Sequence, residues 1–152
     1  MGRTALLLGA TGLVGREVLS CLLEEPEYDK VHILARRPLD VMHPKLNVAI
    51  SDLDHMEDHE ALFRVDDIFC CLGTTIKKAG TREAFRKVDY EYPLRAARLG
   101  EKNGASRYML VSAMGASKDS RFFYSRVKGE LEEALKQMKY EKFVTLRPSL
   151  LL

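Results

Sequence analysis

One pair of side chains has the types and spacing for proton transfer. Within the stretch FFYSRVKGE, Tyr124 and Lys128 are four residues apart, so on a helix they share one face. A free phenol has a pKa of about 10, and it needs a nearby cation to act as an acid or base near neutral pH. Lys128 is the candidate cation. The alternative is an exposed tyrosine beside a solvated lysine, because this spacing also occurs by chance.

Three glycines near the amino end have the spacing of a phosphate-binding turn. Gly9, Gly12 and Gly15 lie between a short apolar run and an amphipathic segment. Glycines placed in this way let the backbone approach a pyrophosphate, which then lies against the amino end of the helix. Because strand, spacing and helix agree, we predict a dinucleotide site. A glycine-rich turn without a ligand is the alternative.

Two arginines occupy the position that distinguishes one dinucleotide from another. Arg36 and Arg37 follow the apolar run VHILA, where NAD-binding proteins of this kind carry an acid for the ribose hydroxyls. A guanidinium can instead bind the 2′-phosphate of NADP through charge-assisted hydrogen bonds. The pair therefore predicts NADP(H) as the preferred cofactor, with NAD(H) as the second choice. Two solvated arginines at the exit of a strand are the alternative.

Alternating strands and helices must position these residues. Short β-rich apolar runs alternate with longer amphipathic stretches, which is typical of βαβ units on a parallel sheet. The predicted strands are Thr4–Gly9, Val31–Ala35, Asn47–Ile50, Asp67–Leu72, Tyr108–Ser112 and Phe143–Leu146. The predicted helices are Leu13–Glu24, Thr81–Glu101 and Arg121–Tyr140, with Thr81 as the N-cap of the second and Pro93 bending or splitting it. Residues 51–63 predict a loop and at most a short helix.

Composition and charge are those of an ordinary globular protein. The chain has 152 residues, of which 46% are apolar and 30% charged, so we expect one domain with a substantial core. Its 24 basic and 22 acidic residues give a net charge of +2, which offers no support for a nucleic-acid or membrane surface. No segment approaches the roughly 18 apolar residues of a membrane helix.

The cysteines indicate a reducing compartment. Cys21, Cys70 and Cys71 are odd in number and form no CxxC or His-rich spacing. We therefore expect no metal site and interpret all three as reduced, buried thiols of a cytoplasmic protein. Redox sensing by one of them is the alternative.

Together, the glycine turn, the predicted sheet and the YxxxK pair resemble the short-chain dehydrogenase/reductase superfamily. The resemblance is closer to an atypical branch that includes the eukaryotic Tat-interacting oxidoreductase-like protein and bacterial nucleoside-diphosphate-sugar epimerases or dehydratases. The segments that carry it are FCCLGTT at 69–75, KAG at 78–80, FRKVD at 85–89, FFYSRVKGE at 122–130 and LRPSLLL at 146–152. We expect a single NAD(P)-binding Rossmann domain over residues 1–152. Its fold would be α/β and doubly wound, with a mostly parallel sheet in the order 3-2-1-4-5-6.

The resemblance also implies roles for single residues. Tyr124 would donate or accept the proton, and Lys128 would bind the nicotinamide ribose. The other implied contacts are Thr11, Gly12, Leu13 and Val14 on the pyrophosphate, Arg36 and Arg37 on the 2′-phosphate, Leu72 and Gly73 on the ribose side, and Leu151 at the nicotinamide end.

Two departures from the superfamily pattern bear on activity. Its enzymes place a Ser or Thr after the fifth strand to bind the substrate oxygen. Ser112 is the candidate here, but Met114 stands close to the same position. The superfamily's substrate-binding segment follows LRPSLLL, so we expect the natural polypeptide to continue beyond Leu152.

The leading functional prediction is an NADP(H)-dependent oxidoreductase that acts on a small carbonyl or alcohol, with Tyr124, Lys128 and Ser112 as catalytic residues. A sugar-nucleotide epimerase or dehydratase would use the same residues with a retained cofactor. The alternative from another class is a regulatory protein in which NADPH stabilises a surface for a protein partner or a second copy, without turnover. The intact Tyr124 and Lys128 pair favours the enzyme, and Met114 favours the regulatory protein.

Overall fold

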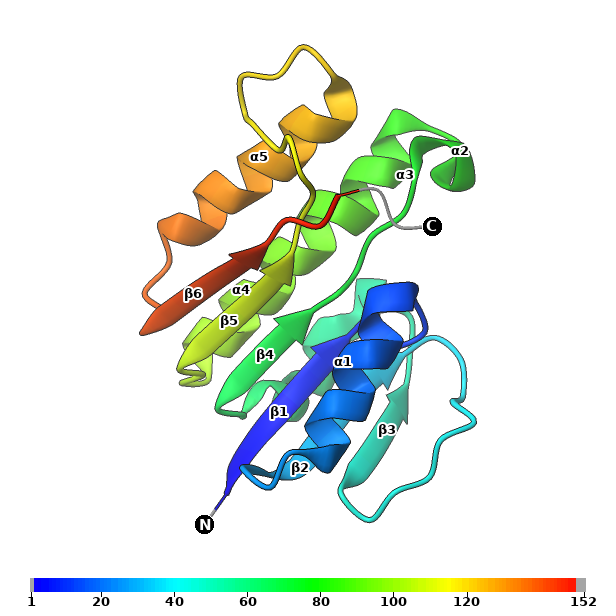
Figure 1. Ribbon diagram of the computed structural model, residues 1–152, viewed down its shortest axis with the longest axis vertical. Coiled ribbons are helices and arrows are strands. Elements are labelled where there is room, and N and C mark those ends of the chain that lie inside the picture. Colours follow the sequence, from blue (N-terminus) through cyan, green and yellow to red (C-terminus); the bar gives the residue numbers. More distant parts are fainter. Residues whose placement is uncertain (1, 150–152) are drawn as a thin grey trace.

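A six-stranded parallel sheet forms the centre of the computed structural model, which describes residues 2–149 (Figure 1). The order across the sheet is β3-β2-β1-β4-β5-β6 and every neighbouring pair is parallel, so the predicted topology is confirmed. In chain order the elements are β1 (Arg3–Leu8), α1 (Leu13–Glu24), β2 (Tyr28–Ala35), β3 (Leu46–Ile50), the 3₁₀ helix η1 (Leu53–Phe63), β4 (Asp67–Cys70), α2 (Ile76–Ala79), α3 (Arg82–Arg86), the π-helical turn η2 (Lys87–Glu91), α4 (Tyr92–Lys102), β5 (Arg107–Val111), α5 (Phe123–Lys136) and β6 (Lys142–Leu146).

Helices cover the sheet on both faces (Figure 1). α1 packs on one face, and η1, α4 and α5 pack on the other. Successive side chains of a strand point to opposite faces. Leu6 and Leu8 of β1 therefore join the cluster under α4 and α5, whereas Ala5 and Leu7 join the cluster under α1. β1 is thus the centre of the core, and these four side chains are fully buried.

The strands that follow β1 in the chain are added first on one side of β1 and then on the other. β2 and β3 lie on one side of β1, and β4, β5 and β6 lie on the other. The loops that leave β1 and β4 therefore diverge, and ligands of doubly wound sheets bind in the crevice between such loops. The two loops touch at their start, where a Cβ added to Gly9 would lie 2.5 Å from the carbonyl oxygen of Cys71.

The predicted helix Thr81–Glu101 is three elements rather than one. Thr81 caps α3 as predicted, since its hydroxyl accepts the N–H of Ala84 at 3.0 Å. The chain then widens into the π-helical turn η2, and Pro93 lies in the first turn of α4. In a regular helix a proline ring clashes with the carbonyl four residues earlier, here that of Asp89. The π turn accommodates the ring, as such turns do inside helices.

Other differences from the sequence analysis are smaller. The last predicted helix, Arg121–Tyr140, is shorter in the structure, where α5 covers Phe123–Lys136. Residues 53–63 form the irregular 3₁₀ helix η1, and the short helix α2 was not predicted.

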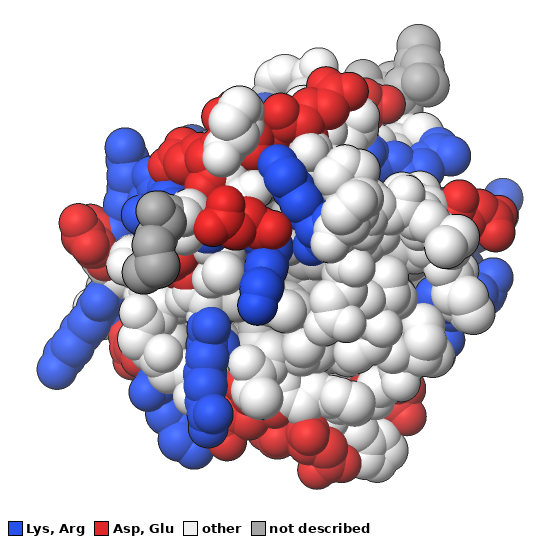
Figure 2. All heavy atoms as spheres, turned by 90° about the horizontal axis from the view of Figure 1, so that it is seen from below, with Lys and Arg blue, Asp and Glu red and all other residues white. Residues whose placement is uncertain are grey.

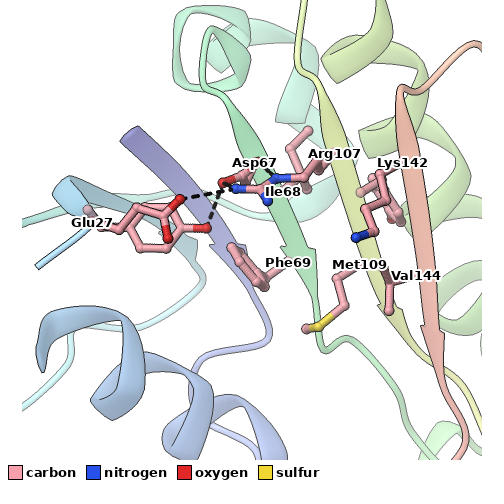
Figure 3. Close-up of a pocket in the computed structure, with 10 residues that line it drawn as sticks. Glu27, Asp67, Ile68, Phe69, Arg107, Met109, Lys142 and Val144 are labelled. Carbon is pink, nitrogen blue, oxygen red and sulfur yellow. Dashed lines mark hydrogen bonds and ion pairs between the residues drawn. The ribbon is translucent and has the colours of Figure 1, made fainter. Parts of the chain in front are cut away.

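The α1 side of β5 and β6 carries no helix among residues 2–149 (Figure 1). A hollow of about 250 Å³ lies on this face, with the side chains of Phe69, Met109 and Val144 along it (Figure 3). The amino-end edge of the sheet, seen in Figure 2, mixes basic and acidic side chains around an uncharged area. No helix within the described part of the chain is long and apolar enough to cross a membrane.

A buried carboxylate ties β1, β2, β4 and β5 together beside this hollow, and Figure 3 shows Asp67 with its partner Arg107 there. Asp67 is 2% exposed and accepts hydrogen bonds from both Arg3 and Arg107 at 2.7 to 3.0 Å, and from the Tyr28 hydroxyl at 2.6 Å. Burial acts to raise the pKa of Asp67, but these hydrogen bonds outweigh it and hold that pKa well below its usual range.

Asp67→Asn is expected to lower the free energy of unfolding by about 3 kcal/mol, because it leaves two guanidinium groups without their buried counter-charge. The folded-state pKa lies below the unfolded-state value of about 3.9. The contribution of Asp67 is therefore complete above that pH and is lost as the pH falls below it. Urea unfolding should show the full difference between wild type and variant at pH 7 and a smaller one at pH 3, where the loss has begun but the folded-state pKa has not been reached. Asp119→Asn, at an exposed position, is the control, and equal effects of the two substitutions would contradict the prediction.

Candidate cofactor-binding and active site

A cavity of about 800 Å³ opens at the carboxyl ends of β1, β2 and β4. It brings together many of the residues that the sequence predicted to bind a dinucleotide, namely Gly9, Thr11, Gly12, Arg36, Arg37, Leu72 and Gly73. It also gathers residues that the sequence analysis did not single out, including Asp52, Asp54, Lys78 and Tyr92. The cavity lies at the switch point of the sheet, where such a ligand is expected.

The glycines of the turn have two different tasks. Gly9 has a φ of 83°, in the left-handed region, and a Cβ added to Gly15 would lie 1.8 Å from the Gly9 carbonyl oxygen. These two glycines let α1 pack directly against the turn. Gly12 has no close neighbour on its open side, where the nearest atom to an added Cβ is 3.8 Å away, and it lines the cavity.

The amino end of α1 fits an anion. Its N-cap is Gly12, which supplies no side-chain hydrogen bond, and its first turn contains no acid. The first-turn N–H groups, including those of Leu13 and Val14, have no partner within the helix. These N–H groups and the positive end of the helix dipole suit a pyrophosphate, so the turn fits the phosphates of a dinucleotide.

The arginine pair adds positive charge to the same cavity. Arg36 and Arg37 are exposed, and neither has an ion-pair partner among residues 2–149. The acid Asp54 on the cavity wall is paired with Lys87 at 2.8 Å, and the hydrogen bond from Lys87 lowers its pKa. Asp52, the other acid on the cavity wall, lies 2.9 Å from His55 Nδ1, so both acids have partners and the charges of the two arginines remain for a ligand.

α5 carries Tyr124 and Lys128 on one face, as the sequence predicted. The Lys128 ammonium lies 5.6 Å from the centre of the Tyr124 ring, which packs on Phe85 with 5.4 Å between ring centres. The Tyr124 side chain is 36% exposed, whereas Lys128 is buried. Lys128 adjoins the cavity at Gly73, where an added Cβ would lie 3.7 Å from its Nζ. Lys128 therefore borders the cavity, whereas Tyr124 is not among the residues that line it.

A buried acid completes this site, and the sequence analysis missed it. The Asp89 carboxylate forms an ion pair with Lys128 and accepts the N–H of Thr74 at 3.0 Å. Asp89 is in η2 and is fully buried. One signal could have identified it: Phe85, Asp89 and Pro93 recur at intervals of four residues within a predicted helix, and all three are buried. An acid on the buried stripe of a helix needs a partner inside the protein.

Ser112 does not present a free hydroxyl at the end of β5. It is buried, and its hydroxyl donates to Glu132 at 2.6 Å. Burial acts to raise the pKa of Glu132, but Arg147 and Ser112 outweigh it and lower that pKa. The Ser112 hydroxyl is therefore occupied by a buried carboxylate, and the geometry does not favour its predicted contact with a substrate oxygen. Met114 is 61% exposed.

The remaining predictions concern the thiols and the carboxyl end. Cys21 is exposed, contrary to its interpretation as a buried thiol, whereas Cys70 is buried and Cys71 is half-buried. Burial raises the pKa of Cys71 to about 12, which keeps this thiol protonated and argues against redox sensing by it. The contact predicted for Leu151 lies outside residues 2–149.

Solved structures share the fold. MoeE5 in complex with UDP-glucose and NAD matches with a TM-score of 0.78 and 17% identity, over 95% of this chain and 53% of that chain. A UDP-glucose 4-epimerase from Thermotoga maritima with UDP-glucose matches with a TM-score of 0.76 and 16% identity, over 95% and 54% of the two chains. At these identities the likeness concerns the fold alone.

Curated relatives are more similar in sequence. Protein HTATIP2 of Rattus norvegicus is 34% identical over 99% of this chain and 63% of its own length. Protein FMP52, mitochondrial, of Meyerozyma guilliermondii is 37% identical over 97% of this chain and 65% of its own length. The chain thus spans about two-thirds of the length of these relatives.

The names of the fungal relatives correct one prediction. The cysteines favoured a cytoplasmic protein, but relatives from several yeasts are named mitochondrial, so the prediction of a cytoplasmic protein is wrong. Reduced thiols distinguish oxidising from reducing compartments. They do not tell one reducing compartment from another.

The family assignment agrees with the geometry of the cavity. The NAD(P)H-binding family matches residues 9–151, a range that begins at the first glycine of the turn and includes both arginines and the Tyr124 and Lys128 pair. We conclude that the chain belongs to the NAD(P)H-binding family and is a homologue of HTATIP2.

Proposed function

We propose that the chain is an NADP(H)-dependent oxidoreductase of the short-chain type that acts on a small carbonyl or alcohol. The observation that carries this proposal is the cavity, which joins the glycine turn to the free arginine pair and adjoins Lys128 at Gly73. One cleft therefore offers groups of suitable chemistry to the phosphates and to the nicotinamide ribose of a dinucleotide.

In this mechanism the groups of the chain bind the cofactor and move one proton, and Lys128 takes part in both. The first turn of α1 binds the pyrophosphate, Arg36 and Arg37 bind the 2′-phosphate, and Lys128 binds the nicotinamide ribose. The bound nicotinamide supplies or accepts the hydride. During reduction Tyr124 donates its hydroxyl proton to the substrate oxygen, and during oxidation it takes that proton back. The Lys128 ammonium stabilises the negative charge that forms on the phenol oxygen.

Two other functions each have an observation in their favour. A sugar-nucleotide epimerase or dehydratase, with Tyr124 in the same role and a retained cofactor, is favoured by the shared fold of proteins solved with UDP-glucose. A regulatory protein that binds NADPH and a protein partner without turnover is favoured by Ser112, whose hydroxyl is bound to Glu132.

Two measurements separate these functions. Mass spectrometry of the purified protein identifies any dinucleotide that co-purifies with it. NADPH oxidation is then followed with aldehydes, ketones and quinones, and UDP-glucose is tested for conversion without net oxidation. Turnover of a carbonyl supports the oxidoreductase, conversion of UDP-glucose supports the epimerase, and NADPH binding with neither activity supports the regulatory protein.

The arginine pair is expected to favour NADPH over NADH. One charge-assisted contact to the 2′-phosphate contributes about 1.5 to 3 kcal/mol, or about 10- to 150-fold in affinity. Calorimetry should show this preference in the wild type and its loss in Arg36→Ala/Arg37→Ala. Arg98→Ala, at an exposed position on α4, is the matched control. Equal dissociation constants for the two cofactors in the wild type would refute the assignment.

A further inference from the structure

The buried acid Asp89 is not explained by the core alone. Its carboxylate is fully buried, and the Lys128 side chain that faces it is 6% exposed. Such a pair is costly to desolvate, and apolar residues of similar size would often stabilise a fold as well. Packing alone therefore does not account for a charged pair at this position.

The two carboxylate oxygens of Asp89 hold two different segments. Oδ1 pairs with Lys128 of α5, and Oδ2 accepts the Thr74 N–H from the loop after β4. Between them lies Gly73, which lines the dinucleotide cavity. A Cβ added there would lie 3.6 Å from Asp89 Oδ1 and 3.7 Å from Lys128 Nζ. The Asp89 and Lys128 ion pair therefore lies behind Gly73, next to the wall of the cavity.

The backbone places Asp89 there through the π turn. Pro93 follows four residues later, and η2 is the widened turn that accommodates its ring. π turns of this kind are frequent at functional sites. The same irregularity that breaks the helix thus directs a carboxylate toward α5 and the β4 loop.

Few other ionisable groups face this pair. One is the phenol of Tyr124 on α5, whose ring centre lies 5.6 Å from the Lys128 ammonium. The other is the buried Cys70 thiol on β4. Burial raises the pKa of Asp89, although the Lys128 ammonium and the Thr74 N–H act against it. Asp89 is thus the acid that pairs with Lys128 among the described residues.

We propose that Asp89 is a positioning residue for cofactor binding, acting through Lys128. An ammonium has three N–H donors. The Asp89 charge holds this ammonium beside Gly73, where its N–H donors can reach the nicotinamide ribose hydroxyls. This inference rests on the proposed function, because it requires a nicotinamide ribose at Lys128.

The test is a double-mutant cycle with two ligands. Asp89→Asn removes the charge and keeps the side-chain size, Lys128→Met removes the ammonium, and the double variant combines both. NADPH reaches the Lys128 end of the cleft, whereas adenosine 2′,5′-bisphosphate contains only the adenosine end. Asp89→Asn should lower the affinity for NADPH about 10-fold, as expected for loss of one oriented hydrogen bond from a charged group. It should change the dissociation constant of adenosine 2′,5′-bisphosphate by less than twofold. In the Lys128→Met background it should not weaken NADPH binding any further.

Each other outcome counts against the proposal. Equal weakening of both ligands by Asp89→Asn would mean that the residue only supports the fold. An undiminished effect in the Lys128→Met background would mean that it does not act through Lys128. If Lys128→Met weakens NADPH but Asp89→Asn does not, this inference fails while the proposed function stands. If Lys128→Met leaves NADPH unchanged, the nicotinamide end of the proposed function fails as well.

A measurement on the wild type covers the case in which Asp89→Asn does not fold. The ¹⁵Nζ resonance of Lys128 should be visible as a slowly exchanging ammonium, because the ion pair is buried. It should shift on addition of NADPH and stay in place on addition of adenosine 2′,5′-bisphosphate. A rapidly exchanging ammonium, or an equal response to both ligands, would overturn the proposal.

Discussion

Tyr124→Phe is expected to lower the turnover of a carbonyl substrate by about 10²- to 10⁴-fold, the range for loss of a general acid or base. The substitution removes one hydroxyl and leaves the ring, which packs on Phe85. NADPH affinity should hardly change, because the phosphates are bound at the glycine turn and the arginine pair. At most one hydrogen bond, worth about 0.5 to 1.5 kcal/mol, is lost with the phenol. The measurement is NADPH oxidation with aldehydes, ketones and quinones, beside calorimetry with NADPH.

Tyr90→Phe is the matched control for this substitution. Tyr90 is a half-buried tyrosine of η2 whose ring packs under the Arg86 guanidinium at 4.1 Å. Its loss of a hydroxyl should leave turnover within a few-fold of wild type. Activity that survives Tyr124→Phe unchanged would remove Tyr124 from the mechanism. If the wild type binds NADPH and shows no activity with any substrate, the regulatory function is favoured instead.

Gly15→Ala is expected to remove cofactor binding and to lower the free energy of unfolding by about 3 kcal/mol or more, the upper range for overpacking. The added Cβ would lie 1.8 Å from the carbonyl oxygen and 2.7 Å from the carbonyl carbon of Gly9. Both are backbone atoms of the turn that follows β1, so α1 would have to move away from the turn. Urea unfolding and NADPH titration of the same preparation measure the two effects.

Gly12→Ala separates packing from binding in the same turn. Its added Cβ would have only the Gly9 carbonyl oxygen within 4 Å, at 3.8 Å, so stability should stay within about 0.5 kcal/mol of wild type. The methyl group would enter the cavity at the amino end of α1, and NADPH affinity should fall at least 10-fold because a pyrophosphate needs close approach of the backbone there. Tight NADPH binding by Gly12→Ala, or a stable Gly15→Ala, would contradict this division of tasks.

The sequence predicted those features that depend on local pattern. α1 begins and ends where its apolar spacing and Pro26 place it, and the strand order follows from alternating strands and helices with one reversal. The glycine turn and the arginines end strands, so the sheet alone brings them to one edge. Their proximity could be predicted although they are distant in sequence, because the carboxyl ends of parallel strands meet at that edge.

The features that the sequence did not predict depend on contacts between distant segments. Ser112 was expected to face a substrate, but its partner Glu132 is twenty residues away on α5. Asp89 was overlooked because a predicted continuous helix says nothing about the π turn that directs its carboxylate to Lys128. In both cases the deciding interaction is a buried hydrogen bond or ion pair between elements, and no local pattern encodes its geometry.

The central position of β1 has a consequence for how the chain acquires its structure. Residues 5–8 of β1 pair with residues 67–70 of β4, and β4 pairs in turn with β5. Because β1 is synthesised before β4, one of its edges stays unpaired until β4 has been made. None of the strand pairings among residues 2–149 is a local hairpin, so loop closure precedes each gain in contacts, and folding in milliseconds to seconds is expected rather than in microseconds. Until β4 has been made, the unpaired edge of β1 along its apolar residues 5–8 is available for wrong partners, and it is at this stage that a chaperone would matter most.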